Sequence, residues 1–113
     1  MEITIERSYE FTPEWNENKK DANPIVFEMR RLSTGERDKL MAYNFTTEGQ
    51  LQIAPDRQGM FRSAVVGIRN LKVNGESVSR AVDLLSRPGL DALFAEVVTD
   101  IISQNSREDL KNS

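Results

Sequence analysis

The feature that most constrains the fold of this chain is an apolar stripe near its C-terminus. The stripe keeps the spacing of one helix face for more than three turns, through Leu90, Leu93, Phe94, Val97, Val98, Ile101 and Ile102. A helix with such a face must bury it in its own core or share it with a neighbouring subunit. We therefore predict a long helix that begins just after Pro88, because proline suits the first helical turn.

Two segments near the N-terminus predict antiparallel strands. Apolar and polar side chains alternate in residues 2–11, and they alternate again in residues 25–32. This pattern is typical of strands with one buried face and one wet face. The polar stretch 12–24, bounded by two prolines, is interpreted as a flexible loop that joins the strands into a β-hairpin.

Helical signals dominate the rest of the chain. Ser33 and Glu36 form a capping-box pattern, which predicts a helix over residues 34–43 with Leu40 and Tyr43 turned inward. A second helix is predicted over residues 57–70, because four apolar residues fall on one face of a 3.6-residue period: Phe61, Ala64, Val65 and Ile68. The remaining expectations are a loop over 44–59 with a short strand at 51–53, a tight turn at Asn74-Gly75, and a short helix capped by Ser79 and ending at Leu85.

These signals predict an α+β fold, as a mostly helical single domain over residues 1–113 with an N-terminal β-hairpin. Residues 1–32 form the hairpin region, residues 33–113 the helical region, and residues 106–113 a polar tail with Ser106 as its cap. Hydrophobic residues make up 38% of the chain. Even with the six glycines added, the apolar share stays below the roughly 45–50% usual for globular proteins. Such a lean core predicts a homo-oligomer.

The composition excludes several kinds of chemistry. The chain contains no cysteine and no histidine, which excludes disulfides and the usual zinc sites. No glycine-rich phosphate loop and no calcium-binding loop is present. Glu96 and Asp100 lie one turn apart on the last predicted helix, and we interpret them as part of a solvated face. We expect a non-enzymatic protein without catalytic residues, cofactor or metal.

Charge is distributed along the chain in blocks. Residues 57–87 carry six basic and two acidic residues, a net charge of +4. Residues 1–56 carry seven basic and eleven acidic residues, a net charge of −4, and residues 88–113 carry two and five, a net charge of −3. The acidic ends argue against a dedicated nucleic-acid binder, which needs a clustered basic face. Opposed blocks favour contacts between subunits or with a partner protein.

Some residues are candidates for contact with a partner or a second copy. Arg62 and Arg69 fall on one face of the predicted second helix, with Lys72 just beyond. They could follow a phosphate backbone, but no aromatic residue interleaves with them to stack bases, so a solvated or subunit-contacting face is favoured. Trp15, the only tryptophan, either covers an edge of the core or is an exposed anchor. The candidate residues are Trp15, Arg62, Arg69, Phe94, Val97 and Ile101.

Targeting signals are absent from the sequence. No apolar run approaches the roughly 20 residues that span a bilayer. The first residues, MEITIERSYEF, lack the basic-then-apolar order of a secretory signal. We expect a soluble cytoplasmic protein with no membrane partner.

The order of these segments resembles a family of phage proteins. A short N-terminal strand region leads into a helix start, RRLSTGERDKL. A central helix, FRSAVVGIRNL, is followed by a glycine turn in VNGESV, a short helix, a proline, a long apolar helix and a charged tail. This order is similar to the tail assembly chaperones of long-tailed bacteriophages and their prophages. The residues that stand in matching positions are Leu84, Leu85, Pro88, Glu108, Lys111 and Asn112.

The resemblance implies a function in phage tail morphogenesis. It implies a protein that binds the tape measure protein and tail-tube subunits in the host cytoplasm, associates with itself, and has no enzymatic activity or cofactor. Two alternatives stay open. The first is another structural phage protein, such as a connector or tail-completion subunit. The second is a small nucleic-acid-binding regulator that uses Arg62, Arg69 and Lys72.

Overall fold

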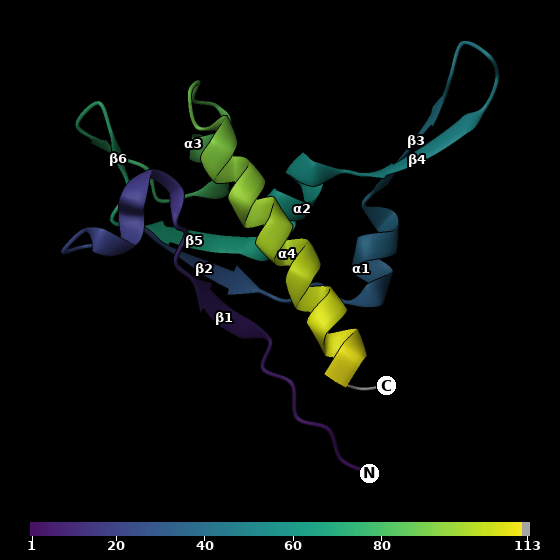
Figure 1. The fold of residues 1–113 in the computed structure, drawn as a ribbon, viewed down its shortest axis with the longest axis horizontal. Helices are drawn as coiled ribbons and strands as arrows, with labels where there is room; N and C mark the ends of the chain where they lie inside the picture. Colours follow the sequence, from purple (N-terminus) through teal and green to yellow (C-terminus); the bar gives the residue numbers. More distant parts are fainter. Residues whose placement is uncertain (112–113) are drawn as a thin grey trace.

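The fold comes from a computed structural model, which describes the backbone of residues 1–111 and the side chains of residues 1–104. Figure 1 shows the arrangement of its elements. In chain order they are β1 (Ser8–Phe11), the 3₁₀ helix η1 (Trp15–Lys20), β2 (Val26–Arg30), α1 (Thr34–Lys39), β3 (Met41–Phe45), β4 (Leu51–Pro55), α2 (Arg57–Ala64), β5 (Val65–Arg69), β6 (Lys72–Val73), β7 (Glu76–Ser77), α3 (Ala81–Leu85) and α4 (Asp91–Lys111).

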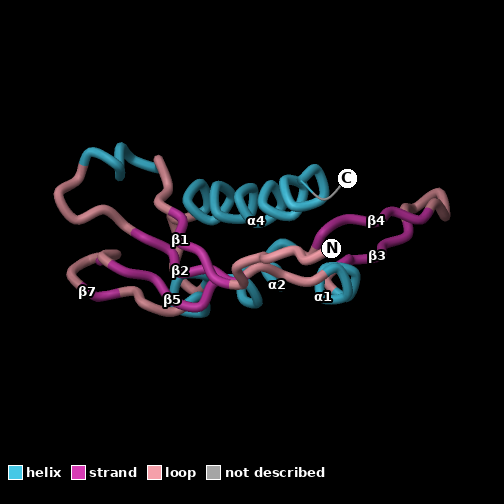
Figure 2. The backbone as a smooth tube through the Cα atoms, turned by 90° about the horizontal axis from the view of Figure 1, so that it is seen from below, coloured by secondary structure: helices cyan, strands magenta, loops and turns pink. Residues whose placement is uncertain are grey.

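A three-stranded antiparallel sheet lies at the centre of the molecule. Its order is β1-β2-β5, and Phe27 in the middle strand pairs with Phe11 on one side and Ile68 on the other. Helix α4 crosses one face of this sheet (Figures 1 and 2). The expected pairing of the two N-terminal strands is confirmed, although the first strand begins only at Ser8.

The core lies where the sheet, α2 and α4 meet. Phe27, Phe61, Leu93 and Val97 are all completely buried there. The ring of Phe61 makes an edge contact with Phe27, with 6.2 Å between the ring centroids. It also packs against Phe94 at 5.2 Å. The stripe predicted for the last helix is therefore the main apolar contact of α4 with the rest of the chain.

Two carboxylates of α4 hold the N-terminal region against the helix. The backbone amides of Glu14 and Trp15 donate hydrogen bonds to the Glu96 carboxylate, at 2.6 and 2.9 Å. The hydroxyl of Tyr9 donates to Asp100 at 2.9 Å, beneath an Arg31 guanidinium that lies 4.7 Å from the Tyr9 ring centre. Glu96 and Asp100 thus fasten β1 and η1 to α4, and their interpretation as a merely solvated face is wrong.

The segment 12–24, expected as a flexible loop, contains the 3₁₀ helix η1. Its buried Asn18 closes the segment on itself. The Asn18 amide nitrogen donates to the carbonyls of Pro13 and Ile25, and its oxygen accepts from the Ile25 amide at 2.7 Å. These hydrogen bonds stabilise one conformation of the segment, because another conformation would leave the buried Asn18 amide and its backbone partners unpaired.

The expectation of a mostly helical domain is wrong. Within the described residues, the chain is a small α+β domain with seven strands in three sheets, and five of those strands lie in the region expected to be helical. The second predicted helix stops at Ala64, and Val65–Arg69 forms β5. The apolar spacing fits a helix, but Val65 and Ile68 are β-branched and favour a strand that can pair with β2.

Other boundaries also differ from the sequence predictions. The capping box of Ser33 and Glu36 is present, but α1 ends at Lys39, and the next residues form β3. Arg80 rather than Ser79 occupies the N-cap of α3, without a side-chain cap. Pro88 lies in a turn with Gly89, three residues before α4 begins at Asp91. The Asn74-Gly75 turn is confirmed, with both residues at positive φ between β6 and β7.

The C-terminal features of the sequence are only partly described. The backbone of α4 continues without a break through Lys111. The proposed cap at Ser106, the side chains of Glu108 and Lys111, and all of Asn112 lie outside the described residues.

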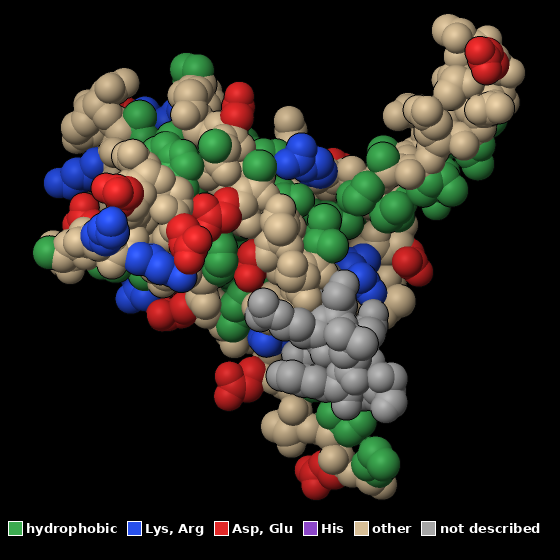
Figure 3. Space-filling view, viewed as in Figure 1, with side chains coloured by type: hydrophobic (Ala, Val, Ile, Leu, Met, Phe, Trp, Pro, Cys, Tyr) green, Lys and Arg blue, Asp and Glu red, His purple; other side chains and the backbone are tan. Residues whose placement is uncertain are grey.

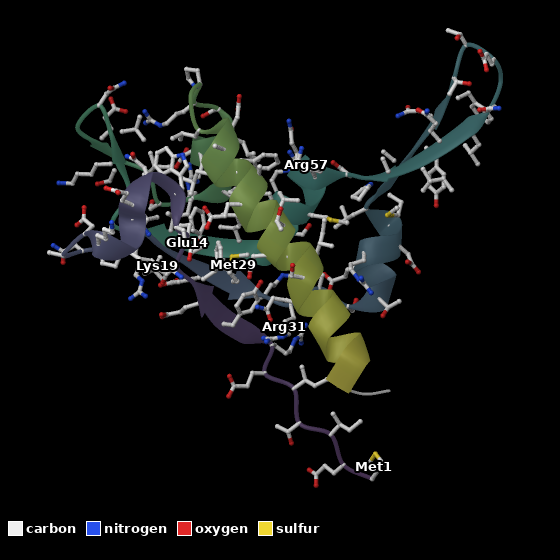
Figure 4. All side chains as sticks on the ribbon, in the orientation of Figure 1. Met1, Glu14, Lys19, Met29, Arg31 and Arg57 are labelled. Atoms are coloured by element: carbon white, nitrogen blue, oxygen red, sulfur yellow. The ribbon has the colours of Figure 1, made fainter. Side chains whose placement is uncertain are left out.

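The molecule is flat and extended for its length. Its principal extents are 48 × 46 × 20 Å, and its radius of gyration is 16.0 Å. A compact domain of this length has a radius of gyration of roughly 13 Å. The excess comes from parts that project from the body, namely the β3–β4 hairpin and the extended residues 1–7 (Figure 1). In Figure 4, Met1 marks the far end of that N-terminal segment.

We predict that Val97→Asp lowers the free energy of unfolding by several kcal/mol, because it places an unpaired charge in the core. Chemical denaturation followed by circular dichroism measures the effect. Ile102→Asp is the matched control on the same helix, since Ile102 is 42% exposed whereas Val97 is fully buried. Equal effects of the two substitutions would contradict the placement of α4.

We also predict that Glu96→Ala releases η1 from α4. The fluorescence of Trp15, the only tryptophan, should shift to the red. The amides of Glu14 and Trp15 should exchange faster with solvent, because their acceptor is removed. Glu48→Ala, at an exposed glutamate in the β3–β4 turn, is the control and should change neither signal. An unchanged Trp15 spectrum in Glu96→Ala would refute this anchoring.

Candidate docking surface

The β3–β4 hairpin, residues 41–55 and here called the β-arm, projects from the body of the molecule (Figure 1). Its two strands pair antiparallel without a register shift, from Met41 opposite Pro55 to Phe45 opposite Leu51. Strands β3 and β4 form a sheet of their own, separate from the sheet of the body.

A well-formed turn closes the β-arm. The amide of Gly49 donates to the Thr46 carbonyl at 2.9 Å, and the Thr46 amide donates to the Gln50 carbonyl at 2.8 Å. The Thr46 hydroxyl accepts a further bond from the Gln50 amide. Gly49 has φ +81°, the left-handed conformation that ends this kind of short hairpin loop. The turn therefore fixes the register, and with it the side chains that share a face.

One face of the β-arm is apolar. Side chains directly opposite in an antiparallel pair lie on the same face, so the pairing places six residues together: Met41, Tyr43, Phe45, Leu51, Ile53 and Pro55. We call this set the arm face. Its four central side chains are more than half exposed: Tyr43 61%, Phe45 76%, Leu51 52% and Ile53 55%. The opposite face carries the pairs Ala42–Ala54 and Asn44–Gln52.

The β-arm is almost without charge. Glu48 in the turn is its one ionisable acid or base with a formal charge at pH 7, in a chain of which 29% is charged. Figure 3 shows hydrophobic side chains along the β-arm and a single acidic side chain near its tip. Exposed strand edges in soluble proteins usually carry lysines, prolines or bulges that prevent pairing. The β-arm has only Pro55 at its base, so both its edges and its apolar face are open to a partner.

The base of the β-arm is fixed to the body. The amide of Asp56 donates to the Leu40 carbonyl at 2.7 Å, which closes the hairpin at its root. The Asp56 side chain accepts from the Gly59 amide and caps α2. A Cβ at position 59 would lie 2.4 Å from the Asp56 carboxylate and 2.8 Å from the Leu40 side chain, so any larger residue there would have to displace the capping side chain. The β-arm therefore leaves the body in a defined direction.

An ion pair fastens α1, the element before the β-arm, to the sheet. Arg30 at the end of β2 donates to Glu36 at 2.6 Å and, through its Nε, to the Ser63 carbonyl at 2.7 Å. The hydrogen bond from Arg30, followed by that from the Ser33 amide, lowers the pKa of Glu36 to about 2. The pKa of Tyr9 is raised, mainly by burial and then by the Asp100 carboxylate. Both shifts have structural causes in the contacts that hold the fold together.

The structure does not bring the sequence-predicted contact residues together on one surface. Val97 and Ile101 are buried in the core of this chain. Phe94 is partly buried, and its ring lies 5.3 Å from the Arg57 guanidinium, which Figure 4 shows beside α4. Trp15 is partly buried against the core at the start of η1. Their part in self-association stays a prediction.

The basic candidates do not share a helix face, because the helix ends between them. Arg62 is exposed on α2, whereas Arg69 lies on β5. Arg69 pairs with Glu10 at 2.9 Å and with Glu28 at 3.4 Å. These carboxylates offset its charge across the sheet. The prediction that Arg62 and Arg69 share one helix face is therefore wrong.

A second surface feature is an open groove of about 900 Å³ between η1 and the β6–β7 hairpin. Trp15, Asn16 and Lys72 line it, together with Asn70 and Asn74. Asn70 is already bonded to the Pro24 carbonyl. The groove combines amide, hydroxyl and apolar groups without a dominant charge, so its chemistry does not single out one ligand.

The remaining chemistry of the described residues is that of contact surfaces. Among side chains 1–104, no group of three histidine, cysteine, aspartate or glutamate residues is placed to hold a metal ion. None of the described helices combines the length and the hydrophobicity that a membrane crossing requires. The β-arm is the feature with the largest exposed apolar side chains on one face.

The predicted short strand at 51–53 is confirmed as part of β4. Sequence reasoning missed its partner β3, and with it the hairpin, although the signal is present. Met41, Tyr43 and Phe45 alternate with smaller or polar residues, and Leu51 and Ile53 do the same after Gly49. Each alternation is only five residues long, and the first was assigned to the end of a helix. The glycine between the two runs, with matching parity on both sides, is the signal that predicts a hairpin.

Comparisons with known proteins leave the family open: no family model, no curated protein and no solved structure matches this chain.

We predict that the Arg30–Glu36 pair makes stability depend on pH. Because the folded-state pKa of Glu36 is lowered to about 2 from an ordinary 4.5, its contribution is complete above pH 4.5 and is lost as pH falls toward 2. Glu36→Gln should lower the melting temperature at pH 7, and the difference from the parent should shrink between pH 4.5 and 2. A difference that is constant with pH would contradict the ion pair.

Proposed function

We propose that this chain is a non-enzymatic assembly protein that docks onto other protein subunits through the arm face. The observation that carries the proposal is the amphipathic β-arm, whose four central apolar side chains are more than half exposed on one face. Isolated apolar side chains are common on protein surfaces, but a contiguous patch on a projecting element marks an interaction site.

The composition of the arm face fits a protein contact. Cores of protein interfaces are enriched in aromatic residues and methionine and depleted in charge. The arm face contains Tyr43, Phe45 and Met41, and its strands carry no charged residue. An isolated two-stranded hairpin is marginally stable in water, so a partner that covers the arm face would stabilise the β-arm as well as bind it.

The finer proposal is that the protein is a tail assembly chaperone of a long-tailed phage or prophage. The resemblance in the order of sequence segments supports it. The exposed arm face supports it as well, because such a chaperone must cover apolar surface on its client. Its clients would be the tape measure protein and tail-tube subunits, met in the host cytoplasm. The arm face offers contacts of modest area, which suits a client that must later be released.

A second candidate is a structural subunit of the phage tail, such as a connector or tail-completion protein. The open edges of the β-arm favour it, because a neighbouring subunit can add a strand to a free sheet edge. A chaperone and a tail subunit would differ in their fate, since only the subunit would be retained in finished particles.

If the proposal is right, the genes that flank this chain's gene encode a tail-tube protein and a tape measure protein, and binding to those two purified proteins tests it. We expect the parent protein to bind at least one of them, and Tyr43→Ser with Phe45→Ser to weaken that binding at least tenfold. The matched control is Asn44→Ala with Gln52→Ala, on the opposite face of the β-arm. Isothermal titration calorimetry measures the affinities. Equal loss in both double variants, or in neither, would refute docking through the arm face.

A further inference from the structure

We infer that the arm face binds a second copy of this chain, so that two β-arms pack face to face about a two-fold axis. The inference rests on the proposed function, because it names the partner that occupies the same surface. The size of the arm face, its apolar surface and the charges around it favour a second copy as the partner.

The area of the arm face fits a reversible dimer. A tyrosine or phenylalanine can bury about 150–250 Å², and Tyr43 and Phe45 are 61% and 76% exposed. With Leu51 and Ile53, more than half exposed as well, each copy offers on the order of 500 Å². Two copies then bury about 1,000 Å², the lower end of specific protein interfaces. This size predicts association at micromolar concentration.

The best match for the arm face on this molecule is another arm face. Among residues 1–104, the other large apolar side chains that are exposed are Val66 on β5, Val82 on α3, Ile102 on α4, and Met1, Ile3 and Ile5 along the N-terminal segment. None of these groups contains an aromatic side chain or a hydrogen-bonded pair of strands. A contact about a two-fold axis places the same patch on both subunits, and an uncharged apolar face can pack against a copy of itself.

The charges around the β-arm favour an antiparallel arrangement of the two arms. If the two-fold axis passes near the Tyr43–Ile53 pair, Phe45 of each copy lies over the base of the other β-arm. Glu48 at the tip then lies over the base of the other copy, which carries charges of both signs in Asp38, Lys39 and Asp56. In this arrangement the two Glu48 carboxylates are separated by roughly the length of the β-arm. That distance exceeds the Debye length of ~8 Å at physiological ionic strength, so their repulsion is screened.

Sedimentation of the purified chain tests the dimer. We expect a monomer–dimer equilibrium at micromolar concentration. Tyr43→Ser with Phe45→Ser should weaken it at least tenfold, whereas Asn44→Ala with Gln52→Ala should leave it unchanged. The melting temperature of the body reports folding, because the β-arm lies outside the core. A parent chain that stays monomeric at 100 µM, roughly a hundredfold above the micromolar range expected for so small an interface, would overturn the inference, and so would equal dimerisation by both double variants.

Cross-linking tests the face and the direction of contact. The chain has no cysteine, so a single substitution gives a unique thiol. Ile53→Cys near the proposed axis should form a disulfide-linked dimer under mild oxidation, whereas Gln52→Cys on the opposite face should not. Glu48→Cys should not cross-link either, because the antiparallel arrangement keeps the two tips apart. Cross-linking through Gln52→Cys or Glu48→Cys, but not through Ile53→Cys, would overturn the arm-to-arm geometry.

The two proposals can fail separately. If the chain is monomeric but Tyr43→Ser with Phe45→Ser abolishes binding to the tail proteins, the second copy is refuted and the docking function stands. If the chain dimerises through the arm face but binds no tail protein, the dimer stands and the function as a tail assembly protein is refuted.

Discussion

The contact between α4 and the central sheet is the interaction on which the rest of the structure depends. A three-stranded sheet has too little surface to form a core alone, and Leu93 and Val97 of α4 supply the buried layer that covers it. The same helix provides Glu96 and Asp100, which accept hydrogen bonds from the N-terminal region. Without α4 the sheet would lose its apolar cover, and β1 and η1 would lose their polar attachment.

The β-arm depends on different forces. Its stability comes from its cross-strand pairs, the Thr46–Gly49 turn and the attachment at Asp56, and its large apolar side chains lie outside the core. The stability of the body therefore depends on residues other than those of the arm face, and we expect substitutions on the arm face to have little effect on the core. Because the arm face lies outside the core, a small domain can expose this apolar surface without weakening its own core.

Sequence-based predictions were correct where neighbouring residues alone determine the structure. The capping box at Ser33, the Asn74-Gly75 turn and the stripe of α4 are set by neighbouring residues, and all three are present in the structure. Residues 57–70 were assigned to one helix because the switch to β5 depends on pairing with a distant strand. The β-arm was missed for another reason. Its two apolar alternations are only five residues long, and Met41 to Tyr43 also fit the end of the helix that the capping box at Ser33 predicts.

The distribution of charge gives the β-arm a consequence for the protein in the cell. The body places its charges in pairs, such as Arg69 with Glu10 and Arg30 with Glu36, so covering these regions would require the removal of charged groups from water. The strands of the β-arm carry no charge, and covering them has no such cost. The lack of charge also leaves the β-arm without the usual protection against unwanted strand pairing. An exposed apolar surface of this kind promotes aggregation unless a partner covers it. A second copy of the same chain would be available as that partner wherever the chain is synthesised. Exchange of that copy for a client subunit would then keep the arm face covered throughout assembly.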